Sequence, residues 1–210
     1  EVIASIYSAN VDEVEKLAFF LDARSISILK LNPIMAMGRG KPFADCERLL
    51  SISEVLALER AIQIELQPKR KIRIMLDIPP AFKPLSSLVS QDTWGTCGIK
   101  NIVGILADGT ISLCGVGRSV KNLVFGNVLC DSLKNVWEQN ETLLFIREHM
   151  NERLEGVCGK CILKNICLGK CRAFSYYQTG SLTAPFAFCS QALELGLFPQ
   201  TRLSLVETHV

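Results

Sequence analysis

Five of the nine cysteines in this 210-residue chain lie close together, and two more stand upstream on either side of an Asp-Gly pair. The group of five is Cys158, Cys161, Cys167, Cys171 and Cys189, and the upstream pair is Cys97 and Cys114. Thiolates grouped in this way hold iron–sulfur clusters, bind zinc or form disulfides. The choice among these three chemistries decides what the protein does.

The cysteine count argues against a disulfide framework. Nine is an odd number, so complete pairing within the chain is impossible. The N-terminal residues also lack the basic and apolar pattern of an export signal. Grouped cysteines in chains without such a signal are more often metal or cluster ligands. We therefore treat disulfides as the least favoured of the three.

The spacing favours iron–sulfur ligation over zinc. A zinc ribbon usually has two Cys-x2-Cys pairs, and this chain has only one, Cys158 with Cys161. The following intervals, five residues to Cys167 and three more to Cys171, are wider and irregular. Such intervals suit a four-iron cube, whose corners are further apart than the ligands of one metal ion. Zinc remains the alternative.

Composition sets the class of protein. Apolar residues make up 49% of the chain, enough for a packed core. The 23 basic and 21 acidic side chains nearly cancel, and basic residues do not alternate with aromatics, so we expect no nucleic-acid partner. No apolar run reaches the roughly 18–20 residues that span a bilayer, so we expect no membrane partner. The sequence predicts a soluble, cytoplasmic protein.

Residues 1–85 alternate between strand and helix patterns. A βαβαβ run of this kind implies a parallel sheet. Two helices are expected to begin at Asn10 and Ser51, each with a glutamate three positions later as in a capping box, and Pro68 ends the second. The strands are expected at Val2–Tyr7, Ile26–Leu31 and Ile72–Ile78.

Three strands cannot close a barrel, and they leave sheet edges unpaired. The chain also begins at Glu1 rather than at methionine. We therefore expect residues 1–85 to be the last part of a larger α/β domain, and the chain to be a piece of a longer protein.

The chain changes character after a Pro- and Ser-rich stretch, Pro79–Ser90, which is predicted to be a linker. Asp108-Gly109 between Ile99–Leu106 and Thr110–Leu113 predicts a β-hairpin. Asp131 or Ser132 is expected to cap a helix carrying Leu133, Val136 and Trp137, and a second helix is expected at Glu141–Asn151. Between Cys158 and Cys171 there is little periodicity, so a bound group is expected to order this segment.

These residues resemble the seven-cysteine signature of SPASM domains, the C-terminal auxiliary-cluster domains of radical S-adenosylmethionine enzymes. The signature reads Cys97-x11-Gly109-x4-Cys114, then Cys158-x2-Cys161-x5-Cys167-x3-Cys171, then Cys189. The connecting residues agree with the resemblance: Gly126-Asn127, Ser132-Leu133 and Trp137, and then Cys171-Arg172-Ala173 with Tyr176. The implied fold class is α+β, with the C-terminal portion of a partial (β/α)6 barrel at 1–85 and a hairpin-plus-helices SPASM domain at 86–210, organised by two iron–sulfur clusters.

The resemblance also divides the ligands between two auxiliary [4Fe-4S] clusters. It assigns Cys97, Cys114 and Cys171 to the first cluster, and Cys158, Cys161, Cys167 and Cys189 to the second. The first set is one ligand short. Either the first cluster has an open iron, or Cys130 completes it.

Four further positions are interpreted with the resemblance. Cys130 and Cys46 are otherwise expected to be small buried hydrophobes. Arg39, after the second strand, would face the S-adenosylmethionine side of the barrel. Arg172 lies among Lys160, Lys164 and Lys170 in the cysteine stretch, where such a run is either a solvated face or a set of cations that stabilise an anionic cluster.

The family performs radical chemistry with a catalytic [4Fe-4S] cluster, held by a Cys-x3-Cys-x2-Cys motif, and S-adenosylmethionine. That motif does not occur in these 210 residues, so we expect no activity from this chain alone. The resemblance implies a peptide or protein substrate and a reductant such as ferredoxin or flavodoxin. The alternatives are a stand-alone, non-catalytic iron–sulfur subunit that docks on a separate radical enzyme, and a structural zinc protein.

Overall fold

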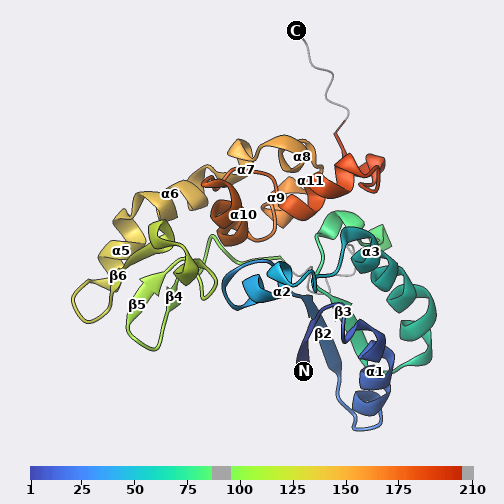
Figure 1. The fold of residues 1–210 in the computed structure, drawn as a ribbon. Helices are drawn as coiled ribbons and strands as arrows, with labels where there is room; N and C mark the ends of the chain where they lie inside the picture. The colour runs from blue at the N-terminus through green and yellow to red at the C-terminus, as the bar shows by residue number, and fades with distance from the viewer. Residues whose placement is uncertain (87–95, 205–210) are drawn as a thin grey trace. The chain divides into compact units, whose positions relative to one another are not determined.

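A computed structural model describes residues 1–86 and 96–204 of the chain (Figure 1). The chain forms two compact units, Glu1–Ile78 and Pro79–Val210. The first is built on a parallel sheet, and the second on a small antiparallel sheet and short helices. Within the described ranges, no helix has the length and apolar character needed to cross a membrane.

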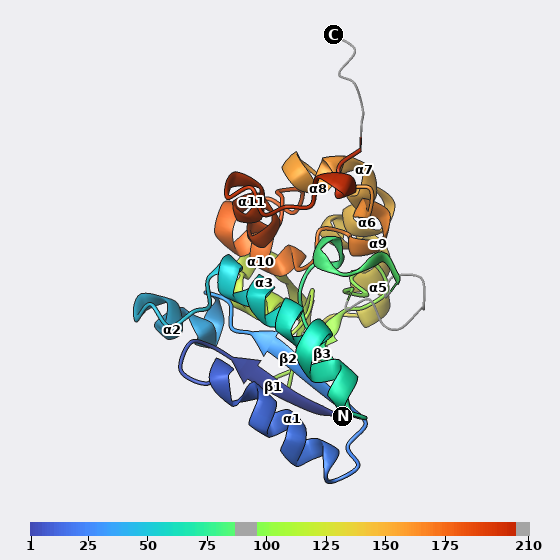
Figure 2. The same cartoon turned by 90° about the vertical axis from the view of Figure 1, so that its right-hand side faces the viewer.

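The first unit contains the predicted parallel sheet. Strands β1 (Val2–Ile6), β2 (Ile28–Pro33) and β3 (Arg73–Leu76) lie in the order β1-β2-β3, and both neighbouring pairs are parallel. Helices α1 (Val14–Asp22) and α3 (Ile52–Ala61) connect the strands and lie beside the sheet (Figure 2). This arrangement confirms the mixed helix-and-sheet prediction for this part of the chain.

The core of this unit forms where the central strand meets the helices. Leu29 and Leu31 of β2 are completely buried, as is Ala18 of α1. Ile62 is equally buried and belongs to a π-helical turn, Ile62–Leu66, that continues α3. A 3-10 turn, Gln67–Lys69, then ends the helical run at the position of Pro68.

The two predicted helix starts have different outcomes. The Ser51 capping box is confirmed, because Ser51 Oγ accepts from Glu54 N at 3.2 Å and Glu54 Oε2 accepts from Ser51 N at 2.7 Å. Asn10 does not cap its helix. Its Oδ1 accepts from Tyr7 N at 2.8 Å and its Nδ2 donates to Ser5 O at 3.1 Å. A short amide side chain can close the turn after a strand as well as cap a helix, and here the turn prevails.

Two short elements follow β2 in the first unit. A 3-10 turn, Gly38–Gly40, leads into helix α2 (Lys41–Asp45). Arg39 lies in that turn and is exposed. Since the turn follows the carboxyl end of a parallel strand, it lies at the sheet edge where α/β proteins place their ligands.

The second unit begins with a three-stranded antiparallel sheet. Strands β4 (Gly104–Ile105) and β5 (Thr110–Ser112) form the predicted hairpin, although both are shorter than expected. Gly109 has a φ of +80°, and a side chain there would meet Asn127 Oδ1 at 2.6 Å. Strand β6 (Val124–Asn127) joins the sheet beside β5 and had no strand prediction.

Seven helices of the second unit follow this sheet within the described residues (Figure 1). Ser132, rather than Asp131, caps the first of them, since its Oγ accepts from Asn135 N at 3.4 Å. The Asp131 carboxylate instead accepts from Asn127 N at 2.7 Å. The helices are α5 (Leu133–Gln139), α6 (Glu141–Glu148), α7 (Met150–Arg153), α8 (Gly156–Lys160), α9 (Lys164–Cys167), α10 (Arg172–Thr179) and α11 (Ala187–Glu194).

The start of the predicted linker is part of the second unit's packing. Pro80–Phe82 forms a 3-10 turn, and Pro79, Pro80 and Ala81 are buried. The Phe82 ring makes edge contacts with Phe188 and Phe198, at centroid distances of 5.2 and 5.5 Å. A proline-rich stretch thus contributes apolar surface here, and positions 87–90 of the linker prediction lie outside the described residues.

The Ser51 capping box predicts a local stability effect. Ser51→Ala removes the acceptor for Glu54 N and should lower the free energy of unfolding of the first unit by about 1 kcal/mol. Ser53→Ala is the matched control on the exposed side of the same turn, and it should be neutral or slightly stabilising. Urea unfolding followed by circular dichroism measures both, and equal effects of the two substitutions would contradict the capping role.

Candidate metal centre

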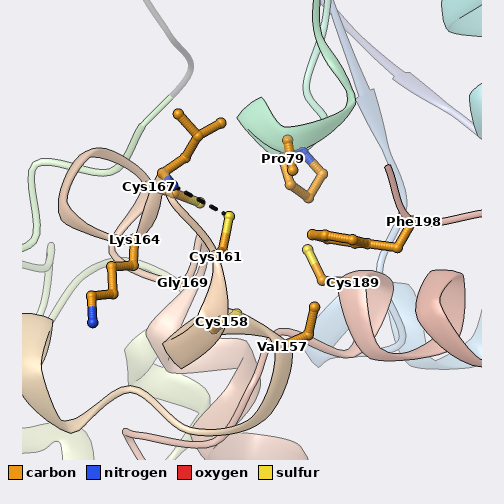
Figure 3. Close-up of a pocket in the computed structure, with 11 residues that line it drawn as sticks. Pro79, Val157, Cys158, Cys161, Lys164, Cys167, Gly169, Cys189 and Phe198 are labelled. Carbon is orange, nitrogen blue, oxygen red and sulfur yellow. Dashed lines mark hydrogen bonds between the residues drawn. The ribbon is translucent and has the colours of Figure 1, made fainter. Parts of the chain in front are cut away.

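Four cysteines of the second unit line one pocket. Figure 3 shows the thiols of Cys161, Cys167 and Cys189 facing this space, with Phe198 and Pro79 beside it and Lys164 pointing away. The fourth thiol, that of Cys158, lies below them in the same view. The pocket wall is otherwise largely apolar, so the four thiols are its principal donor groups.

Short helices bring these four thiols together from distant parts of the sequence. Cys158 lies in α8, and Cys161 ends that helix as its C-cap. Cys167 ends α9, and Cys189 lies in the first turn of α11. Each helix is only one or two turns long and contributes one or two thiols. The chain then turns into the next helix. We call Cys158, Cys161, Cys167 and Cys189 the pocket group.

Backbone N–H groups point at the pocket-group sulfurs. Phe186 N donates to Cys158 Sγ at 3.3 Å, and Leu163 N donates to Cys161 Sγ at 3.4 Å. The second bond is the dashed line in Figure 3. Donors to sulfur stabilise thiolate over thiol, and they also tune the reduction potential of a cluster bound to that sulfur.

A second set of three cysteines is gathered separately, and we call it the sheet group. The charges of Cys114 and Cys171 both act on Cys97. Cys114 follows β5, and its Sγ accepts from Gly117 N at 3.3 Å. Cys171 precedes α10, where the N–H groups of Ala173 and Phe174 favour its thiolate. Cys97, Cys114 and Cys171 are the three residues that the sequence resemblance assigns together.

The turn between Cys167 and Cys171 separates the two groups. Leu168, Gly169 and Lys170 have φ values of +51°, +67° and +60°, so three successive residues are left-handed. For Leu168 and Lys170 this conformation costs about 1–2 kcal/mol each. The turn allows Cys167 to face the pocket group while Cys171 joins the sheet group. Strained backbone of this kind occurs mainly where function requires it.

Arg172 fills the inside of this turn and is only 1% exposed. Its guanidinium donates to Gly169 O, to Ser175 Oγ at 3.0 Å and to Ala184 O at 2.7 Å. Its charge acts on Cys158, Cys167 and Cys189 of the pocket group, and on Cys171 of the sheet group. One buried cation therefore serves both groups. Of the two alternatives, a solvated face does not describe Arg172 or Lys170, which is 7% exposed, whereas Lys160 is exposed.

Burial dominates the electrostatics of the thiols. It raises the pKa of Cys167 to about 11, with the charge of Cys158 adding to the effect. It also raises the pKa values of Cys161, Cys97 and Cys171. Most of these thiols are thus neutral near pH 7, and ligation requires their protons to leave.

Cys158 and Cys189 form a coupled pair within the pocket group. A hydrogen bond from the Cys189 thiol lowers the pKa of Cys158 to about 6, and the same bond raises the pKa of Cys189. Arg172 also lowers the pKa of Cys158. Within this pair the Cys158 sulfur is the one whose ionised form is favoured.

Cys130 and Cys46 are exposed, contrary to the expectation that they are buried hydrophobes. The Cys130 thiol lies 3.6 Å from both Asn127 O and Asp131 Oδ2, and Asp131 is the main cause of its raised pKa. Cys46 is the C-cap of α2 in the first unit. The sequence interpretation placed both inside because cysteine is small, but both lie on exposed turns.

Across residues 1–86 and 96–204, no set of three or more Cys, His, Asp or Glu side chains is arranged to hold a single metal ion. The thiols instead fit a cofactor larger than a single ion. Four buried or half-buried thiols border one largely apolar pocket, and three more are gathered on the other side of the Leu168–Lys170 turn. Seven thiols in two sets suit iron–sulfur clusters.

Three residues of this site had no functional prediction. Pro79 and Phe198 line the pocket, and Arg202 is a buried cation whose charge acts on Cys161. None of the three belongs to the cysteine spacing pattern. The available signals were a lone arginine before a leucine and a phenylalanine before a proline, and both are common.

Residues 97–162 match the family model for SPASM, described as an iron–sulfur cluster-binding domain. The resemblance inferred from the cysteine spacing is thereby confirmed. The matched span contains Cys97, Cys114, Cys158 and Cys161, whereas Cys167, Cys171 and Cys189 lie beyond it. A search of curated proteins finds no match.

Solved structures of anSMEcpe, an anaerobic sulfatase-maturating radical enzyme that uses S-adenosylmethionine, share the fold. The native form with bound AdoMet has a TM-score of 0.56 and 15% identity, over 92% of this chain and 52% of that one. The histidine-tagged form with AdoMet gives a TM-score of 0.58 and 15% identity, over 94% and 52%. The native form with AdoMet and the Cp18Cys peptide gives 0.58 and 15%, over 92% and 53%. This chain thus spans about half the length of these structures.

The strained turn predicts a contrast between two glycines. Gly169 and Gly180 have φ values of +67° and +73°, so an alanine at either position costs about 1 kcal/mol. A Cβ at Gly169 would also overlap the Arg172 guanidinium, whereas nothing lies within 4 Å of a Cβ at Gly180. Gly169→Ala should therefore be the more destabilising by about 1 kcal/mol or more.

Urea unfolding of the metal-free protein followed by tryptophan fluorescence measures this contrast. Trp137 lies in α5 of the second unit, so its signal reports on the unit that contains the turn. If the two alanine variants lost the same stability, Arg172 would not be packed against Gly169 as described.

Proposed function

Since residues 97–162 match a SPASM domain, we propose that this chain binds two auxiliary [4Fe-4S] clusters as part of a peptide- or protein-modifying radical S-adenosylmethionine enzyme. The convergence of the pocket-group thiols on one pocket, with Cys171 directed to the sheet group, carries the proposal. Four thiolates are the ligand count of a fully ligated four-iron cluster.

The two groups would hold the two clusters in different ways. The pocket group supplies a complete set of four thiols, so its cluster has no position left for substrate. The sheet group supplies only Cys97, Cys114 and Cys171, so one iron is open unless Cys130 completes it. When bound, such clusters supply electron transfer, and an open iron supplies a site for a substrate ligand such as a peptide thiolate.

The protein's own contribution at the pocket group is to exclude water and hold the sulfurs. The apolar wall around the thiols includes Phe198, Val157 and Pro79. The N–H groups of Phe186 and Leu163 point at two of the sulfurs, and the Arg172 guanidinium offsets their negative charge. An apolar, water-poor site makes each of these interactions stronger than it is in water.

The wider assignment concerns the rest of such an enzyme. We assign 1–85 to the end of a partial (β/α)6 barrel and 86–210 to the SPASM domain, with Arg39 on the S-adenosylmethionine side. The catalytic [4Fe-4S] cluster and S-adenosylmethionine belong to the full-length enzyme, with ferredoxin or flavodoxin as reductant in the cytoplasm. The anSMEcpe structures with AdoMet and with the Cp18Cys peptide support this class of cofactor and substrate.

The second candidate is a separate, non-catalytic iron–sulfur subunit. The observation behind it is that these 210 residues contain no Cys-x3-Cys-x2-Cys motif. A reading frame that carries this motif upstream of Glu1 would exclude this candidate.

Iron and sulfide analysis of the anaerobically purified protein tests the proposal. We expect about eight irons per chain with matching sulfide, and a brown colour. Cys161→Ala removes one pocket-group ligand and should lower the iron content by up to about half. Cys46→Ala is the control, because Cys46 is exposed and lies in the first unit. A colourless protein that contains zinc and no iron would contradict the proposal.

The role of Cys130 is testable by the same approach. Its exposed thiol is held beside Asp131, whose charge opposes a thiolate. We therefore expect Cys130→Ala to leave the iron content and the electron paramagnetic resonance spectrum unchanged. An added small thiol should then alter the signal of the sheet-group cluster by binding its open iron. A Cys130→Ala protein that lost one cluster signal would instead identify Cys130 as the fourth ligand.

A further inference from the structure

A segment well beyond the SPASM match, residues 200–204, is hydrogen-bonded to the chain around Cys161. Gln200–Arg202 is a 3-10 turn, and the residues after it pair with the segment that contains Cys161. Cys161 and Leu203 form an isolated antiparallel bridge. Ile162 N donates to Arg202 O at 2.9 Å, and Ser204 N donates to Lys160 O at 2.8 Å. We call Gln200–Ser204 the strap.

The side chain of Arg202 connects the strap to a second wall of the pocket. Its Nη2 donates to Lys83 O at 3.2 Å, and Lys83 ends the Pro80–Phe82 turn. Pro79 and Ala81, next to and within that turn, line the pocket. Arg202 therefore joins two parts of the pocket wall, the Cys161 segment through its carbonyl and the Pro80–Phe82 turn through its guanidinium.

The burial of Arg202 requires a compensating negative charge. Arg202 is 8% exposed, and its Nε has no hydrogen-bond partner among the described residues. None of the ion pairs found among residues 1–86 and 96–204 includes it. A buried cation without an ion-pair partner lowers the stability of the fold. Losing one of its few hydrogen bonds lowers that stability further. The charge of Arg202 acts on the Cys161 thiol and favours its ionised form, which is the form that ligates a metal.

We propose that Arg202 is a positioning residue for the pocket-group cluster: the strap fixes the Cys161 segment, and the Arg202 guanidinium supplies positive charge beside that ligand. The inference rests on the proposed function, because it requires a cluster in the pocket. It adds a residue outside the cysteine signature to the site. Arg172 stands beside both cysteine groups, whereas Arg202 acts on the pocket group.

The charge of Arg202 should affect the reduction potential of the pocket-group cluster. A positive charge next to a cluster favours addition of an electron, so its removal shifts the reduction potential to more negative values. Arg202→Gln should produce this shift in the pocket-group cluster, and Arg202→Lys should largely restore the original potential. A purely structural role would not separate these two substitutions by charge.

The strap has its own matched pair of substitutions. Ser204→Pro removes the N–H that donates to Lys160 O, and Leu203 already has the extended backbone that precedes a proline comfortably. Ser204→Ala removes only the hydroxyl bond to the same carbonyl. Ser204→Pro should therefore accelerate loss of the pocket-group cluster, whereas Ser204→Ala should have little effect.

The experiment uses the anaerobically purified, cluster-loaded protein, with Lys160→Gln as a control for loss of an exposed cation in the same segment. A redox titration by electron paramagnetic resonance gives both potentials, and a ferrous chelator gives the rates of iron loss. We expect Arg202→Gln to lose the pocket-group cluster about tenfold faster than wild type or Lys160→Gln. The sheet-group signal should be unchanged.

Each outcome decides between the two proposals. Wild-type protein without iron would defeat the proposed function itself. Loaded wild type with an Arg202→Gln variant of the same potential and the same rate of iron loss would overturn this inference alone. If Arg202→Gln fails to fold, Arg202→Lys and Ser204→Pro still test it. An unchanged rate of iron loss in Ser204→Pro would contradict the role of the strap. If metal-free Arg202→Gln and Ser204→Pro are both less stable to unfolding but lose iron no faster than wild type, the segment has a structural role only.

Discussion

The second unit depends on the left-handed turn from Leu168 to Lys170. Two cysteines only four positions apart, Cys167 and Cys171, must face different sites, and a regular helix would place them on one side. Three successive left-handed residues reverse the chain instead. The energetic cost of this backbone is offset by the Arg172 guanidinium, which fills the turn and donates to Gly169, Ser175 and Ala184.

The charges around the turn form a consistent pattern. The seven thiols are buried or half-buried, and burial makes most of them poor thiolates when no metal is bound. Arg172 and Arg202 are buried, and their Nε atoms have no hydrogen-bond partner within the part of the chain that the structure describes. Neutral thiols beside unpaired cations are an unfavourable combination, whereas thiolates beside the same cations are favourable. Binding of a metal cluster, which holds the sulfurs in their ionised form, would therefore be favoured by these two cations.

Sequence reasoning succeeded where a physical rule is local. The Ser51 box, the Gly109 hairpin and the βαβαβ run each follow from a few neighbouring residues. It failed where tertiary contacts decide, as at Asn10, where the side chain closes a turn, and at Pro79, which became a pocket wall rather than linker. No local pattern marks Arg202, since its contacts are with Lys83 and with the Cys161 segment, both distant in sequence.

The central claim is that one chain holds two separate clusters on either side of the turn. Native mass spectrometry of the anaerobically loaded protein tests it most directly, because it counts bound clusters per chain and distinguishes them from zinc. We predict two cluster-sized mass increments in wild type and one in Cys161→Ala, with Cys46→Ala identical to wild type. A single increment in wild type, or the mass of zinc ions alone, would contradict the account.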